Sequence, residues 1–180
     1  MIPNIPFTIV RAGAEDADAL LEYLRIVGGE TDNLSFGAEG VSIDPEAEQT
    51  YLRNQADSHD NVQYLAKAGN ELIGTASLNR QRNRMRHRGV FGISLKRAYW
   101  GCGAASALTE AVLAFAREND FAQLELEVRS DNLRAIRLYE KYGFRKLCTL
   151  PAFFRVDGQD FDLDLMILPL NSSAKKEGNA

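Results

Sequence analysis

The sequence predicts an α/β fold with a mixed, mostly antiparallel central sheet of about six or seven strands and helices on both faces. One observation behind this prediction is that short apolar runs alternate along the chain with segments of helical period. Val90–Leu95, for example, precedes the amphipathic stretch Ala104–Phe115. The other observation is that tight-turn pairs, Gly69-Asn70 and Asp157-Gly158, separate neighbouring strand candidates, as in antiparallel hairpins.

The composition suits one globular domain. The 180 residues are 45% hydrophobic, which is enough to bury a sizeable core, and we assign residues 1–170 to that domain and 171–180 to a polar, disordered tail. The net charge of -4 gives no reason to expect nucleic acid as a partner. With no membrane-length apolar run, no basic leader and two separated cysteines, Cys102 and Cys148, we expect a soluble cytoplasmic protein with free thiols. A homodimer stays open.

The elements follow in chain order. The first half is expected to hold a strand, a helix, an irregular loop, a second helix and two hairpin strands, at residues 7–11, 16–27, 28–42, 44–57, 62–68 and 71–78. Asp44 can cap the second helix, and Pro45 suits its first turn. After the central strand and helix, the remaining strands and helix are expected at residues 123–128, 132–142, 144–156 and 161–168. Gly143 is the natural C-cap of the last helix.

A glycine turn, Gly101-Cys102-Gly103, joins the central strand to the helix that follows. The first turn of a helix leaves amide N–H groups unpaired, and the helix dipole adds roughly half a positive charge there. Small residues let a large anion approach that backbone, so the junction suits a phosphate. It is no P-loop, because no lysine follows the glycines, and Ser106 replaces the third glycine of the dinucleotide pattern. From the residues alone, the turn is either a phosphate site or an ordinary tight turn.

Two blocks of the sequence resemble signatures of the GNAT superfamily of acyl-CoA-dependent N-acetyltransferases. The first, WGCGAA from Trp100 to Ala105, resembles Q/R-x-x-G-x-G/A, with Trp100 in place of the usual arginine or glutamine. The second, NLRAIRLYEKYGF from Asn132 to Phe144, matches N-x-x-A-x-x-L-Y-E-K-x-G-F at every fixed position. The branch it is most similar to acetylates ribosomal proteins or polyamines. The resemblance implies transfer of an acetyl group from acetyl-CoA to a primary amine, by direct attack in a ternary complex and without a metal.

The resemblance also implies where acetyl-CoA binds. The thioester would lie where two central parallel strands, Phe91–Leu95 and Leu124–Val128, splay apart. Backbone groups of the first strand, the glycine turn and the last helix would hold the co-substrate. The residues so implied are Ile93, Ser94, Leu95, Trp100, Gly101, Cys102, Gly103, Ala104, Ala105, Ser106, Asn132, Ala135 and Tyr139. Asn132 would hydrogen-bond the pantetheine arm, which is compatible with its also capping its helix.

Tyr139 is the candidate general acid. It follows Asn132 by seven residues, almost two helical turns, so both side chains face the same way. Attack on the thioester expels a thiolate, and a phenol within hydrogen-bond reach can protonate it. Without the resemblance, the alternative is a core tyrosine on an amphipathic helix.

The base and the acceptor are less constrained. Glu30, Asp32, Glu125 and Glu127 are candidate bases, directly or through water, and none is marked out by spacing. Residues 28–42, which carry the first two, form either a solvated loop or, as in the family, one wall of the acceptor pocket. The acceptor is a protein N-terminus, a polyamine, an aminoglycoside or another small amino compound, because fold alone does not decide the substrate.

Five arginines alternate in RQRNRMRHR, from Arg80 to Arg88. A solvated hairpin loop is the default interpretation, and the alternative is an electropositive lip that attracts CoA phosphates or an acidic acceptor. Nucleic acid ranks last, because no aromatic side chains are interleaved for base stacking.

Two other classes of function stay open. Cys102 stands at a helix N-terminus, where the pKa of a thiol is lowered, so a cysteine hydrolase with His59 or His87 as base is one alternative. The other is a CoA-binding module without catalysis, acting as a sensor or partner.

Overall fold

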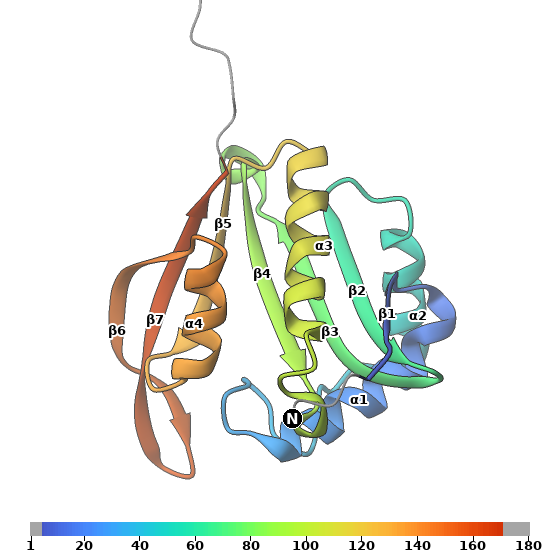
Figure 1. Ribbon diagram of the computed structural model, residues 1–180, viewed down its shortest axis with the longest axis horizontal. Helices are drawn as coiled ribbons and strands as arrows, with labels where there is room; N and C mark the ends of the chain where they lie inside the picture. The colour runs from blue at the N-terminus through green and yellow to red at the C-terminus, as the bar shows by residue number, and fades with distance from the viewer. Residues whose placement is uncertain (1–4, 171–180) are drawn as a thin grey trace, which may run out of the picture.

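The computed structural model describes residues 5–170, so the tail expected at 171–180 lies outside the described residues. All seven strands of the described chain join a single sheet in the order β1-β2-β3-β4-β5-β7-β6 (Figure 1). The strands are β1 (Thr8–Arg11), β2 (Asn61–Ala68), β3 (Glu71–Arg80), β4 (Arg88–Leu95), β5 (Gln123–Arg129), β6 (Arg145–Val156) and β7 (Gln159–Pro169). Every neighbouring pair is antiparallel except β4 and β5, which run parallel. The predicted mixed sheet is therefore confirmed.

Helices cover both faces of the sheet, as predicted. They are α1 (Ala17–Glu30), α2 (Pro45–Gln55), α3 (Ala104–Glu118) and α4 (Leu133–Lys141), with short 3-10 turns η1 (Ala14–Asp16), η2 (Asn83–Met85) and η3 (Arg97–Tyr99). In Figure 1, α3 and α4 lie in front of the sheet, and we call this side the front face. Within residues 5–170, no helix is both long and apolar enough to cross a membrane.

Each face of the sheet has its own core. The front core joins α3 and α4 to the strands and includes Phe91, Leu108 and Leu126. The back core joins α1 and α2 to the strands and includes Tyr23 and Leu65. Each such buried side chain contributes about 1.5–3 kcal/mol relative to an exposed one, so both faces hold the sheet in place.

The central strands β4 and β5 pair only where they begin. Their register runs from Arg88–Gln123 to Val90–Glu125, which is three residue pairs, and ends there. Beyond this point β4 continues beside β3 to Leu95, and β5 continues beside β7 to Arg129. The two strands thus splay apart along the second half of β4, as the resemblance implies.

Local sequence signals predicted most element ends correctly. Asp44 caps α2, and its Oδ2 accepts hydrogen bonds from the amides of Glu46 and Ala47 at 3.1 and 3.2 Å. Gly143 follows α4 with a φ of +91°, a left-handed conformation that glycine adopts without strain.

The predicted end of α1 at Val27 is wrong, because the helix continues through Gly28 to Glu30. A Cβ built on Gly28 would lie 2.0 Å from the carbonyl oxygen of Gly37. The glycine therefore lets the following loop pack closely against the helix instead of ending it, and this brings Glu30 to the start of the loop.

Candidate active site

Backbone groups of β4 face the gap between β4 and β5. The amide of Lys96 donates to the carbonyl of Ile73 on β3 at 2.9 Å. Because alternate residues of an antiparallel ladder bond the same neighbour, the backbone of Ser94 also pairs with β3, whereas the backbone groups of Ile93 and Leu95 face the other way. Of the three residues expected to bind pantetheine, Ile93 and Leu95 therefore present backbone groups to the gap, whereas the backbone groups of Ser94 face β3.

The glycine turn leaves the N-terminus of α3 open. Gly101 and Gly103 have φ values of +86° and +95°, and no side chain caps the helix at Gly103. A Cβ built on Gly103 would meet nothing within 4 Å. The first amides of α3, at Ala104, Ala105 and Ser106, therefore stand at an accessible helix start that fits a phosphate.

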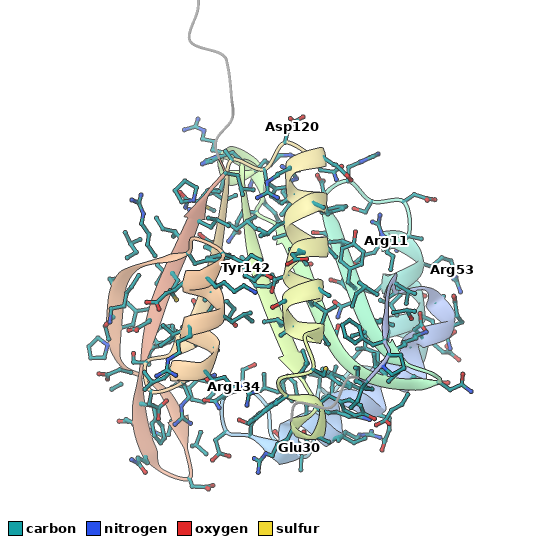
Figure 2. The ribbon with its side chains drawn as sticks, viewed as in Figure 1. Arg11, Glu30, Arg53, Asp120, Arg134 and Tyr142 are labelled. Carbon is teal, nitrogen blue, oxygen red and sulfur yellow. The ribbon has the colours of Figure 1, made fainter. Side chains whose placement is uncertain are left out.

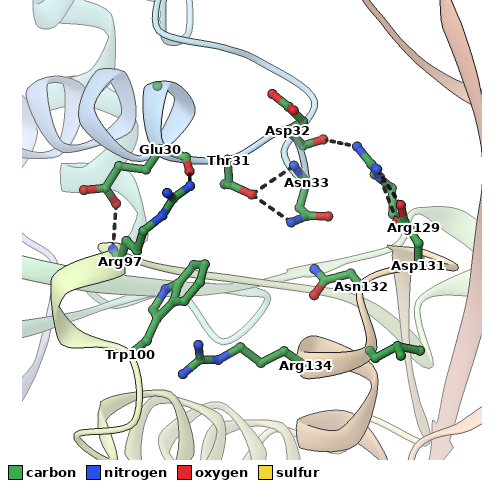
Figure 3. A pocket seen from close by; sticks show the side chains of 12 residues that line it. Glu30, Thr31, Asp32, Asn33, Arg97, Trp100, Arg129, Asp131, Asn132 and Arg134 are labelled. Atoms are coloured by element: carbon green, nitrogen blue, oxygen red, sulfur yellow. Dashed lines mark hydrogen bonds and ion pairs between the residues drawn. The ribbon is translucent and has the colours of Figure 1, made fainter.

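Trp100 lies beside this turn, and the guanidinium groups of two arginines lie over its ring. Its Nε1 donates to the carbonyl of Leu95 at 3.0 Å. The guanidinium carbons of Arg134 and Arg97 lie 4.4 and 5.7 Å from the ring centroid, and Figure 3 shows Arg134 extending from α4 toward the indole. Although Trp100 replaces the usual basic or amide side chain, positive charge is present there from its neighbours.

A cleft of about 670 Å³ lies between three segments. Its lining residues come from the end of α1 and the loop after it, from η3 and its flank, and from the β5–α4 connection: Gly29, Glu30, Thr31, Asp32, Asn33, Arg97, Trp100, Arg129, Asp131, Asn132, Leu133 and Arg134. The cleft brings together four of the predicted residues, namely Glu30, Asp32, Trp100 and Asn132.

Asn132 begins α4, as predicted. Its Oδ1 accepts a hydrogen bond from the amide of Ala135 at 3.2 Å, which is an N-cap contact. This contact uses the oxygen and leaves the amide nitrogen of the side chain to donate into the cleft. Ala135 itself packs against the front core.

Tyr139 lies in the front core between two aromatic rings. Its ring centroid is 6.1 Å from that of Phe91 and 5.9 Å from that of Phe144. The side chain is 6% exposed, and its burial raises the pKa of the phenol to about 12. No described residue hydrogen-bonds the hydroxyl. The phenol therefore stays protonated at neutral pH and has a donor to offer a ligand.

Two of the four candidate bases are already engaged by other residues. Glu30 Oε2 accepts from the amide of Arg97 at 2.6 Å, which fixes η3 to the end of α1. Glu125 is 7% exposed, forms an ion pair with Arg88 and accepts from Gln81 Nε2 at 2.9 Å. Glu125 is therefore a structural acid at the paired end of β4 and β5.

The other two acids are exposed. Glu127 lies two residues beyond Glu125, the last residue of β5 that pairs with β4. Because side chains alternate along a strand, Glu127 lies on the face opposite Leu126 and Val128 of the front core. Asp32 lies on the loop after α1, where its carbonyl, not its carboxylate, is bound by Arg129. Of the four, Glu127 is the acid on a central strand beside the gap.

The structure rules out a hydrolase dyad of Cys102 with either histidine. His59 Nδ1 bonds Asn119 Oδ1 at 2.6 Å, and Asn119 follows the C-terminus of α3. The carbonyl of His87 accepts from the amide of Ala122 at the same end. Cys102 precedes the other end of this 15-residue helix, which is about 22 Å long. The hydrolase interpretation is therefore wrong.

The arginine-rich stretch also lies at the far end of the sheet, between β3 and β4, and β4 alone spans about 26 Å from there to the glycine turn. Arg80 stacks on Phe121 at 3.7 Å from the ring centroid, Arg86 pairs with Asp60 at 2.9 Å, and Arg88 pairs with Glu125. The alternative interpretation of this stretch, a lip for CoA phosphates, therefore does not fit its position, and three of its arginines have structural partners.

Sequence reasoning singled out four of the twelve lining residues and missed the other eight, among them Arg129. Arg129 is 8% exposed at the end of β5 and contacts three other segments of the chain. Its place directly after a strand and before a helix cap was the only signal in the sequence.

A gap beside the backbone of a central strand suits an extended arm with amide groups, and the open helix start suits a phosphate. Both features fit the class of protein that the resemblance implies, one that binds an acylated coenzyme. Residues 31–144 match the model of the acetyltransferase (GNAT) family. N-alpha-acetyltransferase RimI of Mycobacterium tuberculosis is 33% identical over 122 residues, which are 67% of this chain and 74% of that protein.

Solved structures agree. An acetyltransferase of the GNAT family from Streptococcus pneumoniae has a TM-score of 0.88 at 28% identity, over 92% of this chain and 100% of that chain. YncA from Salmonella typhimurium, solved with its cofactor acetyl-CoA, has a TM-score of 0.81 at 19% identity, over 96% and 99%. The chain therefore belongs to the GNAT family: it is an acyltransferase, and acetyl-CoA is its co-substrate.

Proposed function

We propose that the protein is an N-acetyltransferase in which a primary amine attacks acetyl-CoA directly in a ternary complex. The observation that carries this proposal is the position of two titratable groups on opposite faces at the gap. Tyr139 is a residue of α4 that packs in the front core, and Glu127 lies on β5 and faces the other side of the sheet. In this proposal, Tyr139 is the donor and Glu127 the acceptor of protons, on opposite faces of the sheet where β4 and β5 separate.

In this proposal, the chain's own groups first hold the co-substrate. Backbone groups of Ile93 and Leu95 pair with the pantetheine amides, the amides of Ala104 to Ser106 bind the pyrophosphate, and the side-chain amide of Asn132 donates to the arm. Glu127 then takes a proton from the attacking amine, directly or through water, as the carbon–nitrogen bond forms. Tyr139 donates to the sulfur as the carbon–sulfur bond breaks.

The similarity to an N-alpha-acetyltransferase favours a protein N-terminus as the acceptor. Polyamines, aminoglycosides and small amino compounds remain the other amines to be compared. A cytoplasmic location and a homodimer stay predictions of the sequence. The alternative function, a CoA-binding sensor without catalysis, is disfavoured because Tyr139 keeps a protonated hydroxyl without a partner among the described residues.

Thiol release from acetyl-CoA tests this function. The protein is incubated with an alanine-starting peptide, spermidine, an aminoglycoside and a free amino acid, and each acetylated product is identified by mass spectrometry. Glu127→Gln should lower kcat/KM by roughly 10²–10⁴-fold at neutral pH, the usual worth of a positioned base. The matched control is Glu125→Gln, which removes a neighbouring acid on the same face but breaks an ion pair away from the gap. Binding of acetyl-CoA without turnover of any amine would support the sensor instead.

A further inference from the structure

A single guanidinium, that of Arg129, connects β5 to three other segments around the cleft. Its Nε and Nη2 donate to the two carboxylate oxygens of Asp131 at 3.0 and 2.6 Å, at the start of the β5–α4 connection. Its Nη1 donates to the carbonyl of Asp32 in the loop after α1 at 2.9 Å (Figure 3). Its guanidinium carbon lies 3.7 Å from the ring centroid of Phe161 on β7.

These contacts engage every nitrogen of the Arg129 side chain. The bidentate pair with Asp131 lowers the pKa of that carboxyl group below its usual value, so the two charges neutralise each other. Phe161 covers one face of the planar group, and only 8% of the residue is exposed. Arg129 therefore binds other parts of the protein, and a substrate would contact those parts rather than the guanidinium itself.

The part it holds on the α1 side is residues 31–33. Within this segment Thr31 Oγ1 accepts from the amide and the side-chain nitrogen of Asn33, at 3.2 and 2.7 Å. Across residues 5–170, the bond from Arg129 to Asp32 is the hydrogen bond that joins this local turn to the half of the sheet carrying β5, β6 and β7. Without it, residues 31–33 would be held only by their chain neighbours, the end of α1 on one side and Leu34, which packs against the back core, on the other.

We infer that Arg129 is a positioning residue that fixes residues 31–33 as the acceptor-side wall of the cleft and so sets the affinity for the amine. This inference rests on the proposed function. The same guanidinium binds Asp131, which directly precedes Asn132, so the acceptor wall and the start of α4 are held to one group. We expect its contribution in the Michaelis constant of the amine, because the side chain of Asn132 is also held by the amide of Ala135, so acetyl-CoA binding does not depend on Arg129 alone.

Three variants test this inference. Arg129→Met keeps an apolar stem against Phe161 and removes the donors, and Arg129→Lys keeps the charge without the planar fork. Arg80→Met is the matched control, because Arg80 stacks on Phe121 at the same 3.7 Å and donates to backbone carbonyls at the far end of the sheet. Trp100 is the only tryptophan of the chain and lies in the cleft, so its fluorescence reports binding of acetyl-CoA in every variant.

In Arg129→Met, backbone hydrogen exchange of residues 31–40 should become faster. The KM of the most active of the amines tested above should rise about tenfold or more, which is the worth of a lost charged hydrogen bond. The kcat and the acetyl-CoA affinity should stay within about threefold. The amine KM and the exchange rates of Arg129→Lys should be closer to those of Arg129→Met than to those of wild type, because lysine cannot make the bidentate contact. Arg80→Met should lower stability and leave both exchange of residues 31–40 and the KM unchanged.

Unchanged exchange of residues 31–40 in Arg129→Met, or equal acceleration in Arg80→Met, would overturn the inference. So would an unchanged amine KM in an active enzyme, or a loss of acetyl-CoA binding confined to Arg129→Met. If the wild-type protein acetylates no amine of the panel, the proposed function itself fails. That outcome is distinct, because it is seen before any variant is compared.

Discussion

Replacing Tyr139 with phenylalanine removes one oxygen atom and leaves the ring between Phe91 and Phe144. No described residue bonds that oxygen, so the folded state loses no protein hydrogen bond. The free energy of unfolding should therefore change by less than about 1 kcal/mol, and acetyl-CoA should bind within about twofold of wild type. The effect should fall on the chemical step.

The size of that effect follows from the pKa of the phenol, which is about 12. A thiol such as that of CoA has a pKa near that of cysteine, ~8.5, which is well below that of the buried phenol, so complete proton transfer to the thiolate is uphill. Tyr139 should therefore act mainly as a hydrogen-bond donor to the sulfur as charge develops. Such a bond is worth about 1.5–3 kcal/mol, which corresponds to roughly a 10- to 150-fold loss of rate.

Steady-state kinetics with the most active panel amine measure the loss, which should appear in kcat and kcat/KM together. Below about pH 10, the pH–rate profile of the variant should have the same shape as that of wild type, because Tyr139 is protonated throughout that range. The control is Tyr142→Phe, because Tyr142 directly follows α4 and lies between α4 and α3 (Figure 2). Its hydroxyl bonds the carbonyl of Ser106 and Oε1 of Glu110 on α3, at 3.2 and 2.7 Å. The Tyr142→Phe variant should have a lower free energy of unfolding and an unchanged kcat. Turnover within twofold in a folded Tyr139→Phe enzyme would show that Tyr139 is only a core residue.

Two further predictions concern the glycine turn and alkaline stability. Gly103→Glu should weaken acetyl-CoA binding by roughly 100-fold in calorimetry. The change places a carboxylate at the phosphate site and forces a residue with a side chain into a left-handed backbone conformation, which is strained. Gly158→Glu, at an equally open left-handed glycine in the β6–β7 turn, should leave binding unchanged. Tyr23, bonded to Ser94 Oγ at 3.0 Å, has a pKa raised chiefly by burial. Its stabilising effect is complete below about pH 10 and is lost as the pH rises further, by roughly 1.4 kcal/mol per unit. Tyr23→Phe should flatten that decline in urea titrations between pH 9 and 11, and an unchanged slope would contradict the assignment.

The sequence predicted the parts of the fold and site that local chemistry determines. Asp44 caps its helix, Gly143 ends one, and the glycine turn opens another, because each of these needs only a few neighbouring residues. The choice between Glu125 and Glu127 needed the register of β4 on β5, which ends between them and leaves the first in an ion pair.

Tertiary contacts explain what the sequence could not reveal. Arg129 is one more arginine until the chain brings Asp32 and Phe161 to it from 97 and 32 positions away. The stretch from Arg80 to Arg88 looks like a free basic patch until Asp60, Phe121 and Glu125 are placed beside it. Sequence spacing gives no information on either arrangement.

The separation of β4 from β5 also has a thermodynamic consequence for the whole molecule. An acyl-CoA arm that bonds Ile93 and Leu95 would act as an additional short strand between the two halves of the sheet, which the protein alone joins at three residue pairs. A ligand that binds only the folded chain stabilises it by about 2.7 kcal/mol at 100 times its dissociation constant. The resistance of this protein to heat or proteolysis should therefore follow the concentration of its co-substrate, so that folding and metabolic supply are thermodynamically linked.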